Sequence, residues 1–400
     1  MNSFEYKSPT ELIFGKDSEY KVVEMIKKYN GSKVLVHHDS GYLKNSGFID
    51  KVINILIKGG LSVIELGGVC PNPRLSKVYE GIMLCKREGV DFLLPIGGGS
   101  AVDSAKAISL GIKYDGDVWD FYVEDNGVTK AVPVESVPIG VIISIPASGS
   151  EASNSSVITN DNEHLKRFCD VDIIRPKFAI QNPELTMSLS AYQTGCGIID
   201  IMSHSFERYF TRGEGHYLTD RLCEAIFHTC MDCGRILTVN PKDYDARASI
   251  MLTATLSHIG LTGLGRAGDW ATHQIGHELS GKFDMTHGAA IGIVTCAWMK
   301  YVYKEYQPIF LKWATRVMGV EMNYANPDAT ITEAINRLEA FMKLMSVPTR
   351  LSDVKGLPKI DDELIQKLAL RTRITNNEGS VGTFKKLSPE DIANVIRLAI

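Results

Sequence analysis

The chain of 400 residues lacks several features that would place it in a special class of protein. It has no apolar run long enough to cross a bilayer, and its opening MNSFEYKSPTELIF carries charges where the apolar part of a signal peptide would lie. A net charge of −4 gives no basic surface for nucleic acid. We therefore expect a cytoplasmic protein with a small-molecule substrate and without a membrane or nucleic-acid partner.

A disulfide framework is also absent, because the eight cysteines have neither the density nor the regular spacing of one. We expect them to be reduced thiols in a core. Cys230 and Cys233 form a C-x-x-C inside a helical run, but no second pair completes a four-thiolate metal site. Metal binding or redox chemistry at this pair is the weaker interpretation.

The common nucleotide-binding motifs are incomplete. Gly97, Gly98 and Gly99 follow the β-rich segment 91–96, but Val102 stands where the last glycine of G-x-G-x-x-G belongs, and no Gly-Lys-Ser/Thr of a P-loop follows. What remains is a strand, a glycine turn and a helix N-terminus, where backbone N–H groups favour an anion. We predict a pyrophosphate site here; a turn without a ligand is the alternative. A second glycine-bearing turn, residues 145–156, favours the ligand.

Strands and helices alternate in the first half of the chain. Four β-rich runs, at residues 33–38, 61–66, 91–96 and 141–146, are mostly separated by amphipathic segments, which predicts a parallel sheet with right-handed crossovers. After Pro183 the pattern is helical. We predict a Rossmann-like, doubly wound α/β domain for dinucleotide binding over 1–185 and an all-helical metal-binding domain over 186–400. The boundary is the turn-rich segment 173–186.

The second half contains a block rich in histidine, GRAGDWATHQIGHELSGKFDMTHG (265–288). His273 and His277 are four residues apart and would share one helical face, and Asp200 and His204 repeat this spacing. One carboxylate and several imidazoles, His287 included, suit Zn²⁺ or Fe²⁺ in a catalytic site. Core histidines without a metal are the alternative. The block is not a zincin motif, because no glutamate directly follows His273.

A single carboxylate bears on the choice of nucleotide. Asp39 follows the first β-rich run, where it could accept hydrogen bonds from ribose hydroxyls and would repel a 2′-phosphate. This favours NAD over NADP. The alternative is an N-cap of the next helix.

Several motifs together resemble the iron-containing (group III) alcohol dehydrogenases, in particular the butanol dehydrogenase-like branch of NAD(P)-dependent aldehyde/alcohol reductases. They are PNPRLSKVYEG, GGGSAVDSAKAI, IPASGSEAS, GIIDIMSHSFE, the histidine block, VPTRLSDV and FKKLSPEDIANVI. The resemblance spans nearly the whole chain. It implies Asp200, His204, His273 and His287 as ligands of Fe²⁺ or Zn²⁺, and His277 as a residue that assists proton transfer. The alternative is that His277 itself binds the metal. The resemblance also implies a set of cofactor contacts, namely Gly98, Gly99, Ser100, Asp103, Ser144, Ser148 and Lys166.

The activity that the resemblance implies is reversible hydride transfer between a primary alcohol and NAD(P)⁺, in a homodimer. Asp39 departs from the glycines and serine of NADPH-using relatives, so NAD is predicted and NADP is the alternative. Three other functions stay open: a glycerol or polyol dehydrogenase, a lyase similar to dehydroquinate synthase, and a cofactor-binding sensor. The lyase would need several cations near the ligands, where the sequence offers only Lys282 and Arg266.

Overall fold

The computed structural model describes residues 1–123, 127–213, 215–372 and 379–400. The chain forms two compact units. One lies within residues 7–188, and the other joins Met1–Tyr6 to Leu189–Ile400. The first six residues, grouped with the α/β half in the sequence analysis, thus belong to the helical unit, where the Asn2 N–H donates to the Gly265 carbonyl at 2.8 Å.

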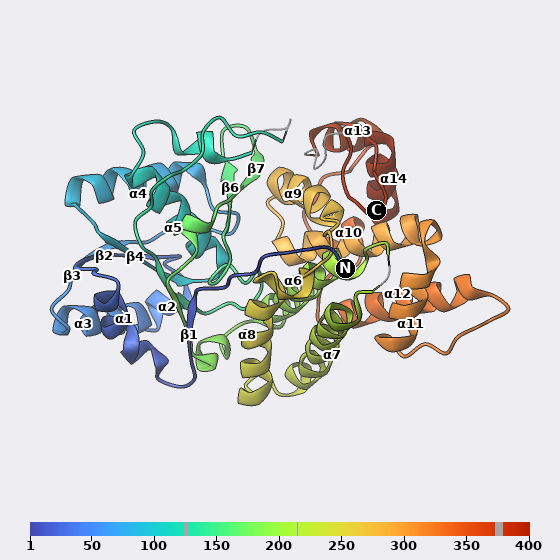
Figure 1. Ribbon diagram of the computed structural model, residues 1–400, viewed down its shortest axis with the longest axis horizontal. Helices are drawn as coiled ribbons and strands as arrows, with labels where there is room; N and C mark the ends of the chain where they lie inside the picture. The colour runs from blue at the N-terminus through green and yellow to red at the C-terminus, as the bar shows by residue number, and fades with distance from the viewer. Residues whose placement is uncertain (124–126, 214, 373–378) are drawn as a thin grey trace. The chain divides into compact units, whose positions relative to one another are not determined.

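The α/β unit is built on a six-stranded parallel sheet in the order β1-β8-β5-β4-β2-β3. In Figure 1, α4 and α5 cover one face of the sheet and α1 and α3 the other, which confirms the predicted doubly wound α/β class. The elements are β1 (Glu11–Phe14), α1 (Val22–Lys28), β2 (Lys33–His38), α2 (Tyr42–Asn45), α3 (Phe48–Lys58), β3 (Ser62–Leu66), α4 (Leu75–Glu88), β4 (Phe92–Gly97), α5 (Gly99–Ile112), β5 (Gly140–Ile143), β6 (Ser155–Asn160), β7 (Leu165–Asp170) and β8 (Phe178–Gln181).

The segment 173–186, expected to be a turn-rich boundary, contains β8 between its two prolines. All four residues of β8 are buried, and the strand pairs with β1 on one side and β5 on the other. Pro176 and Pro183 lie just outside the strand, where a missing N–H removes no ladder hydrogen bond. The prolines therefore bound a central strand.

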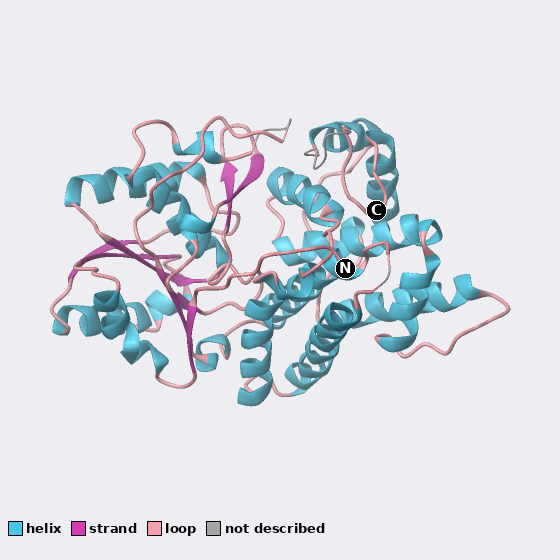
Figure 2. Ribbon diagram, in the orientation of Figure 1, coloured by secondary structure: helices cyan, strands magenta, loops and turns pink. Residues whose placement is uncertain are grey.

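The second unit consists of helices joined by loops and contains no strand in its described residues, and Figure 2 shows the strands in the α/β unit. Its helices are α6 (Ala191–Tyr209), α7 (Tyr217–Val239), α8 (Tyr244–His258), α9 (Ala271–Phe283), α10 (His287–Val302), α11 (Gln307–Arg316), α12 (Pro327–Leu344), α13 (Asp362–Arg371) and α14 (Pro389–Ala399). Stacked rings such as Phe206 on Phe227 and Phe210 on Phe310, both with centroids 4.5 Å apart, fill its core. No helix in the described ranges has both the length and the apolar character needed to cross a membrane.

Candidate metal centre and cofactor loops

The candidate metal centre is built on α6, a helix that lies at the centre of the helical unit. Ser190 begins it with a capping box, its hydroxyl accepting from the Gln193 N–H. Every residue from Thr194 to Tyr209 is buried, including Asp200 and His204. Burying such polar groups is unfavourable unless each is satisfied, so the surroundings of these two side chains decide what they can bind.

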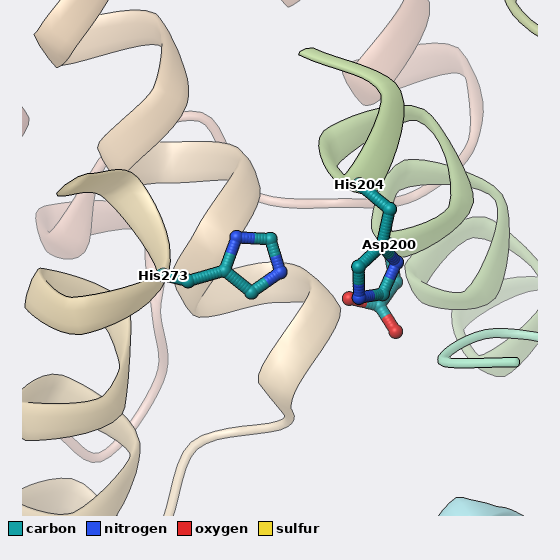
Figure 3. Close-up of side chains that lie close together, drawn as sticks. All are labelled: Asp200, His204 and His273. Atoms are coloured by element: carbon teal, nitrogen blue, oxygen red, sulfur yellow. The ribbon is translucent and has the colours of Figure 1, made fainter. Parts of the chain in front are cut away.

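Asp200 and His204 meet His273 of α9. The three side chains are buried, and each offers a ligand atom within 4.8 Å of the others. Figure 3 shows them pointing toward one another from two helices. In the part of the chain that the structure describes, His204 Nδ1 and His273 Nε2 are buried and have no hydrogen-bond partner. A divalent cation would satisfy both atoms, so these residues fit a metal ion.

His287 lies at the start of α10, beside the other three. Its Nε2 is 3.7 Å from Asp200 Oδ1, and its ring centroid is 5.6 Å from that of His273. Gly288 makes this approach feasible, because a Cβ there would lie 2.0 Å from the Cys196 carbonyl oxygen of α6. The structure thus brings together all four side chains that the family resemblance implied as ligands.

Glu207, which the sequence analysis did not single out, orients one of these imidazoles. It is buried on α6, and its Oε1 accepts from His273 Nδ1 at 2.7 Å and from the His273 backbone N–H at 3.0 Å. Thr272 Oγ1 also donates to it. A proton on Nδ1 leaves the lone pair of His273 on Nε2, the atom that faces Asp200 and His204.

Replacing Glu207 with glutamine is expected to weaken metal binding roughly 10- to 100-fold, the usual effect of losing such an orienting partner. Competition with a chelator measures the dissociation constant. Glu224→Gln is the matched control, since Glu224 is buried too but bonds to Tyr209 and Arg221 instead of a histidine. Equal metal affinity in wild type and Glu207→Gln would contradict the orienting role.

His258 is a further imidazole that the sequence analysis missed. It ends α8, and its ring centroid lies 4.2 Å from that of His204. Burial lowers the pKa of His204 well below its usual value, and the nearby His258 and His273 rings lower it further. His204 is therefore neutral, as a metal ligand must be. No spacing rule identifies His258, because α6 and α8 meet only in the folded unit.

His277 lies next to the four side chains that the family resemblance implies as ligands. Its ring centroid is 5.3 Å from that of His287 and 6.4 Å from that of His273. The neighbouring Glu278 is buried and pairs with Arg371, Oε2 to Nε 3.4 Å. His277 and His287 both lie outside the buried cluster of three, and His277 is close enough to act on a group near the ligands.

The predicted cofactor residues gather at one edge of the sheet. The strands β2, β4 and β5 are neighbours in the sheet. Each is directly followed by a predicted cofactor residue, namely Asp39, Gly98 and Ser144 in that order. Parallel strands end at the same edge, so these positions lie near one another. The strand order reverses at β2, because β3 lies on one side of it and β4 on the other, and such switch points bind ligands in open α/β sheets.

Two of the loop glycines pack closely against the neighbouring loop. A Cβ at Gly98 would lie 3.0 Å from Ile145, and one at Gly99 would lie 2.5 Å from Ser148 Oγ. Gly98 is the N-cap of α5, so Gly99 and Ser100 form the first turn of the helix. The loop therefore presents helix N–H groups, with the Ser148 hydroxyl beside them, as an anion site requires.

Asp103, which is partly buried, and Lys166, which is buried, support these loops. Asp103 accepts from Ser150 Oγ and from the Val157 N–H, while Lys166 donates to Asn72 Oδ1 at 2.9 Å. Lys106, which the sequence analysis missed, is also buried and donates to the carbonyl oxygens of Ser150, Ser153 and Ser155. Burial lowers the pKa of Lys106 to about 8. Through these hydrogen bonds Asp103 and Lys106 hold the second glycine-bearing turn, residues 145–156, against α5.

Asp39 is exposed at the end of β2. Its Oδ1 accepts from the Gly41 N–H at 2.8 Å, and α2 begins at Tyr42 with Gly41 as N-cap and without a side-chain cap. Asp39 is thus not the N-cap of this helix, which was the alternative interpretation. The carboxylate stabilises a local turn and remains accessible to a ligand.

Comparisons with known proteins identify the family of this chain. Residues 9–183 match the family model described as iron-containing alcohol dehydrogenase, and residues 194–400 match the C-terminal model of the same family. The chain belongs to the iron-containing alcohol dehydrogenase family. It is 37% identical to NADH-dependent butanol dehydrogenase A of Clostridium acetobutylicum, over 99% of both chains. The crystal structure of NADH-dependent butanol dehydrogenase A from Thermotoga maritima, 33% identical, superposes with a TM-score of 0.93 over 100% of this chain and 99% of that one.

A second kind of relative within the iron-containing alcohol dehydrogenases uses the other nucleotide. NADPH-dependent aldehyde reductase YqhD of Escherichia coli is 31% identical, over 88% of this chain and 89% of its own. The predicted family and fold class are confirmed. As a member of this family, the protein is a metal-dependent oxidoreductase that acts on alcohols and aldehydes with NAD(P)(H), and iron is the metal of the family.

Proposed function

We propose that this protein interconverts a short primary alcohol, such as butanol, and its aldehyde, with NADH as the preferred nucleotide. The convergence of Asp200, His204 and His273 on one buried point is the observation that carries the metal-dependent part of this proposal. The substrate class follows relatives whose names are NADH-dependent butanol dehydrogenases, 34–37% identical over at least 99% of this chain.

In this proposal Asp200, His204, His273 and His287 hold a divalent ion, with Fe²⁺ as the first candidate and Zn²⁺ as the second. The ion would supply Lewis-acid stabilisation of negative charge on the substrate oxygen. Glu207 keeps the His273 proton on Nδ1. His277 relays the proton that the oxygen gains or loses.

The nucleotide is assigned to the edge of the sheet that is formed by the carboxyl ends of β2, β4 and β5. Gly98, Gly99 and Ser100 would bind the pyrophosphate through the N-terminus of α5, and Ser144 and Ser148 would add contacts from the neighbouring loop. Asp103 and Lys166 would stabilise these loops through their hydrogen bonds to Ser150, Val157 and Asn72. Asp39 would accept from the ribose hydroxyls.

The competing functions find less support in the site. A lyase with a phosphorylated substrate would need several cationic side chains at the metal centre. Of the two that the sequence offered, Lys282 lies exposed at the surface, and Arg266 is paired with Asp220, with Nη2 2.6 Å from Oδ1. A glycerol or polyol dehydrogenase would share the metal centre, and only the choice of alcohol separates it from this proposal.

The direct test follows absorbance at 340 nm with butanal and either NADH or NADPH, and then with glycerol and NAD⁺. The proposal expects nucleotide oxidation with butanal, faster with NADH, and little reduction of NAD⁺ with glycerol. A sensor or a lyase would give no net change in either direction, and a faster rate with glycerol would favour the polyol dehydrogenase.

The assembly and location are part of the same proposal. β1 is an edge strand whose Leu12 and Phe14 are about two-fifths exposed, at 39% and 42%. Exposed apolar edge strands favour pairing with another strand. A homodimer that joins two β1 edges would cover both side chains. A cytoplasmic location suits an enzyme whose charged nucleotide is regenerated inside the cell.

Removing the charge of Asp39 is expected to shift the nucleotide preference. Asp39→Gly should raise kcat/KM for NADPH by about tenfold, since about 1.4 kcal/mol of repulsion corresponds to that factor. Asp39→Asn is the matched variant, because its amide oxygen can still accept from the Gly41 N–H while the charge is gone. Both variants should gain NADPH activity. A wild type that already prefers NADPH would contradict the assignment of Asp39.

A further inference from the structure

Trp270 has an unusual backbone conformation at the start of α9. Its φ is 62° and its ψ is 4°, in the left-handed region. This conformation is unfavourable for a residue with a bulky side chain, and it persists only where surrounding contacts fix it. Such residues cluster at functional sites. The contacts of Trp270 therefore indicate what the conformation serves.

The backbone around Trp270 is fixed from both sides. The N–H of Asp269 donates to the Glu207 carbonyl at 2.8 Å, and the Trp270 carbonyl accepts from the Gln274 N–H in the first turn of α9. The buried Asp269 carboxylate accepts from the N–H groups of Thr383 and Phe384, at 2.7 and 2.6 Å. These bonds tie the residue before Trp270 to α6 and to a segment more than a hundred positions later.

The indole of Trp270 lies beside two of the candidate ligands. Its ring centroid is 5.2 Å from that of His273 and 6.4 Å from that of His204, both in edge-on geometry. The guanidinium carbon of Arg208 lies 4.9 Å from the ring centroid, and Arg208 Nη1 donates to the His204 carbonyl. A Cβ at Gly268 would lie 2.4 Å from the indole nitrogen, so only glycine leaves room for the ring.

We propose that Trp270 is a positioning residue of the metal centre, which holds the imidazoles of His204 and His273 in the orientation that a metal ion requires. The ring contacts one ligand from each of two helices, and its edge-on packing restricts the rotation of both. Ligands that are already oriented lose less conformational freedom when the metal binds. The proposal rests on the metal site proposed above.

Two substitutions separate this role from general packing. Glycine adopts a φ of 62° without strain, so Trp270→Gly removes the ring and eases the backbone together. Trp270→Phe keeps an aromatic ring of smaller size. Ser346→Gly is the matched control, because Ser346 also has a positive φ, 60°, but lies exposed at the end of α12.

The experiment titrates the metal-free full chain with Co²⁺. We expect the Co²⁺ dissociation constant of Trp270→Gly to rise at least about tenfold, with a changed visible absorption spectrum, while its melting temperature without metal stays near that of wild type. Trp270→Phe should lie between the two, and Ser346→Gly should match wild type. Unchanged affinity and spectrum in Trp270→Gly would overturn the proposal.

Tryptophan fluorescence gives a second measurement that remains decisive if Trp270→Gly does not fold. Trp270 packs against two ligand rings, whereas Trp313 lies in the aromatic core beside Phe206 and Phe210. Co²⁺ should quench the emission of wild type and of Trp313→Phe, and quench Trp270→Phe much less. Equal quenching and equal affinity in Trp270→Phe would overturn the proposal. Absence of Co²⁺ binding by wild type would overturn the metal site itself, and this proposal with it.

Discussion

Replacement of His273 by alanine is expected to remove both the bound metal and the dehydrogenase activity. His273 contributes the only ligand from α9 in the buried cluster of three within the described residues, and Glu207 orients it. A Lewis-acidic metal stabilises the transition state by several kcal/mol, so its loss should lower kcat/KM roughly a thousandfold or more. Metal content by elemental analysis and the butanal assay measure the two effects.

The control for this substitution removes an imidazole from the surface of the same unit. His228 is exposed on α7, where its Nε2 contacts the Arg316 carbonyl oxygen, so His228→Ala should keep full metal content and activity. A His273→Ala protein that retains its metal would contradict the ligand assignment, whatever its activity.

Replacement of His277 by alanine should give the opposite pattern, an enzyme that keeps its metal but turns over slowly. The family resemblance implies a role in proton transfer for this residue, and its ring centroid lies 5.3 Å from that of His287. General acid–base assistance contributes roughly 10²- to 10⁴-fold to a rate, so kcat should fall by a factor in this range. Elemental analysis and kcat, measured on the same preparation, test the prediction.

The two histidine variants are most informative together. His273 and His277 are four residues apart on one helix, so a general disturbance of α9 would affect metal content in both. Metal loss in His273→Ala alone supports separate roles. Equal metal loss in both variants would mean that His277 is itself a ligand or that either substitution disturbs α9, and it would contradict the separate roles assigned to the two histidines.

The sequence predicted those parts of the fold that follow from local periodicity. β2 was predicted at its observed residues, and β3 and β4 within one residue, because each is a short apolar run bounded by turns. The β6–β7 hairpin was missed, since SSVITN and LKRFCD carry polar side chains that obscure any apolar alternation. β8 was missed because its four residues lie between two prolines, which dominate the local pattern.

At the site, regular helical spacing placed Asp200 with His204 and brought His273 and His277 to one face. The residues that the analysis missed, Glu207, His258 and Trp270, act through contacts between helices that are distant in sequence. Helical periodicity gives the direction of a side chain around its own axis, but not the neighbouring helix that it meets. Their roles therefore become visible only in the folded structure.

X-ray absorption spectroscopy of the metal-loaded protein tests the central claim most directly, namely that an aspartate and three histidines from α6, α9 and α10 bind one ion. We predict scattering from nitrogen and oxygen ligands at about 2.0–2.2 Å, with the pattern of about three imidazoles and no sulfur. A sulfur shell at about 2.3 Å would assign the metal to some of the eight cysteines and contradict the account.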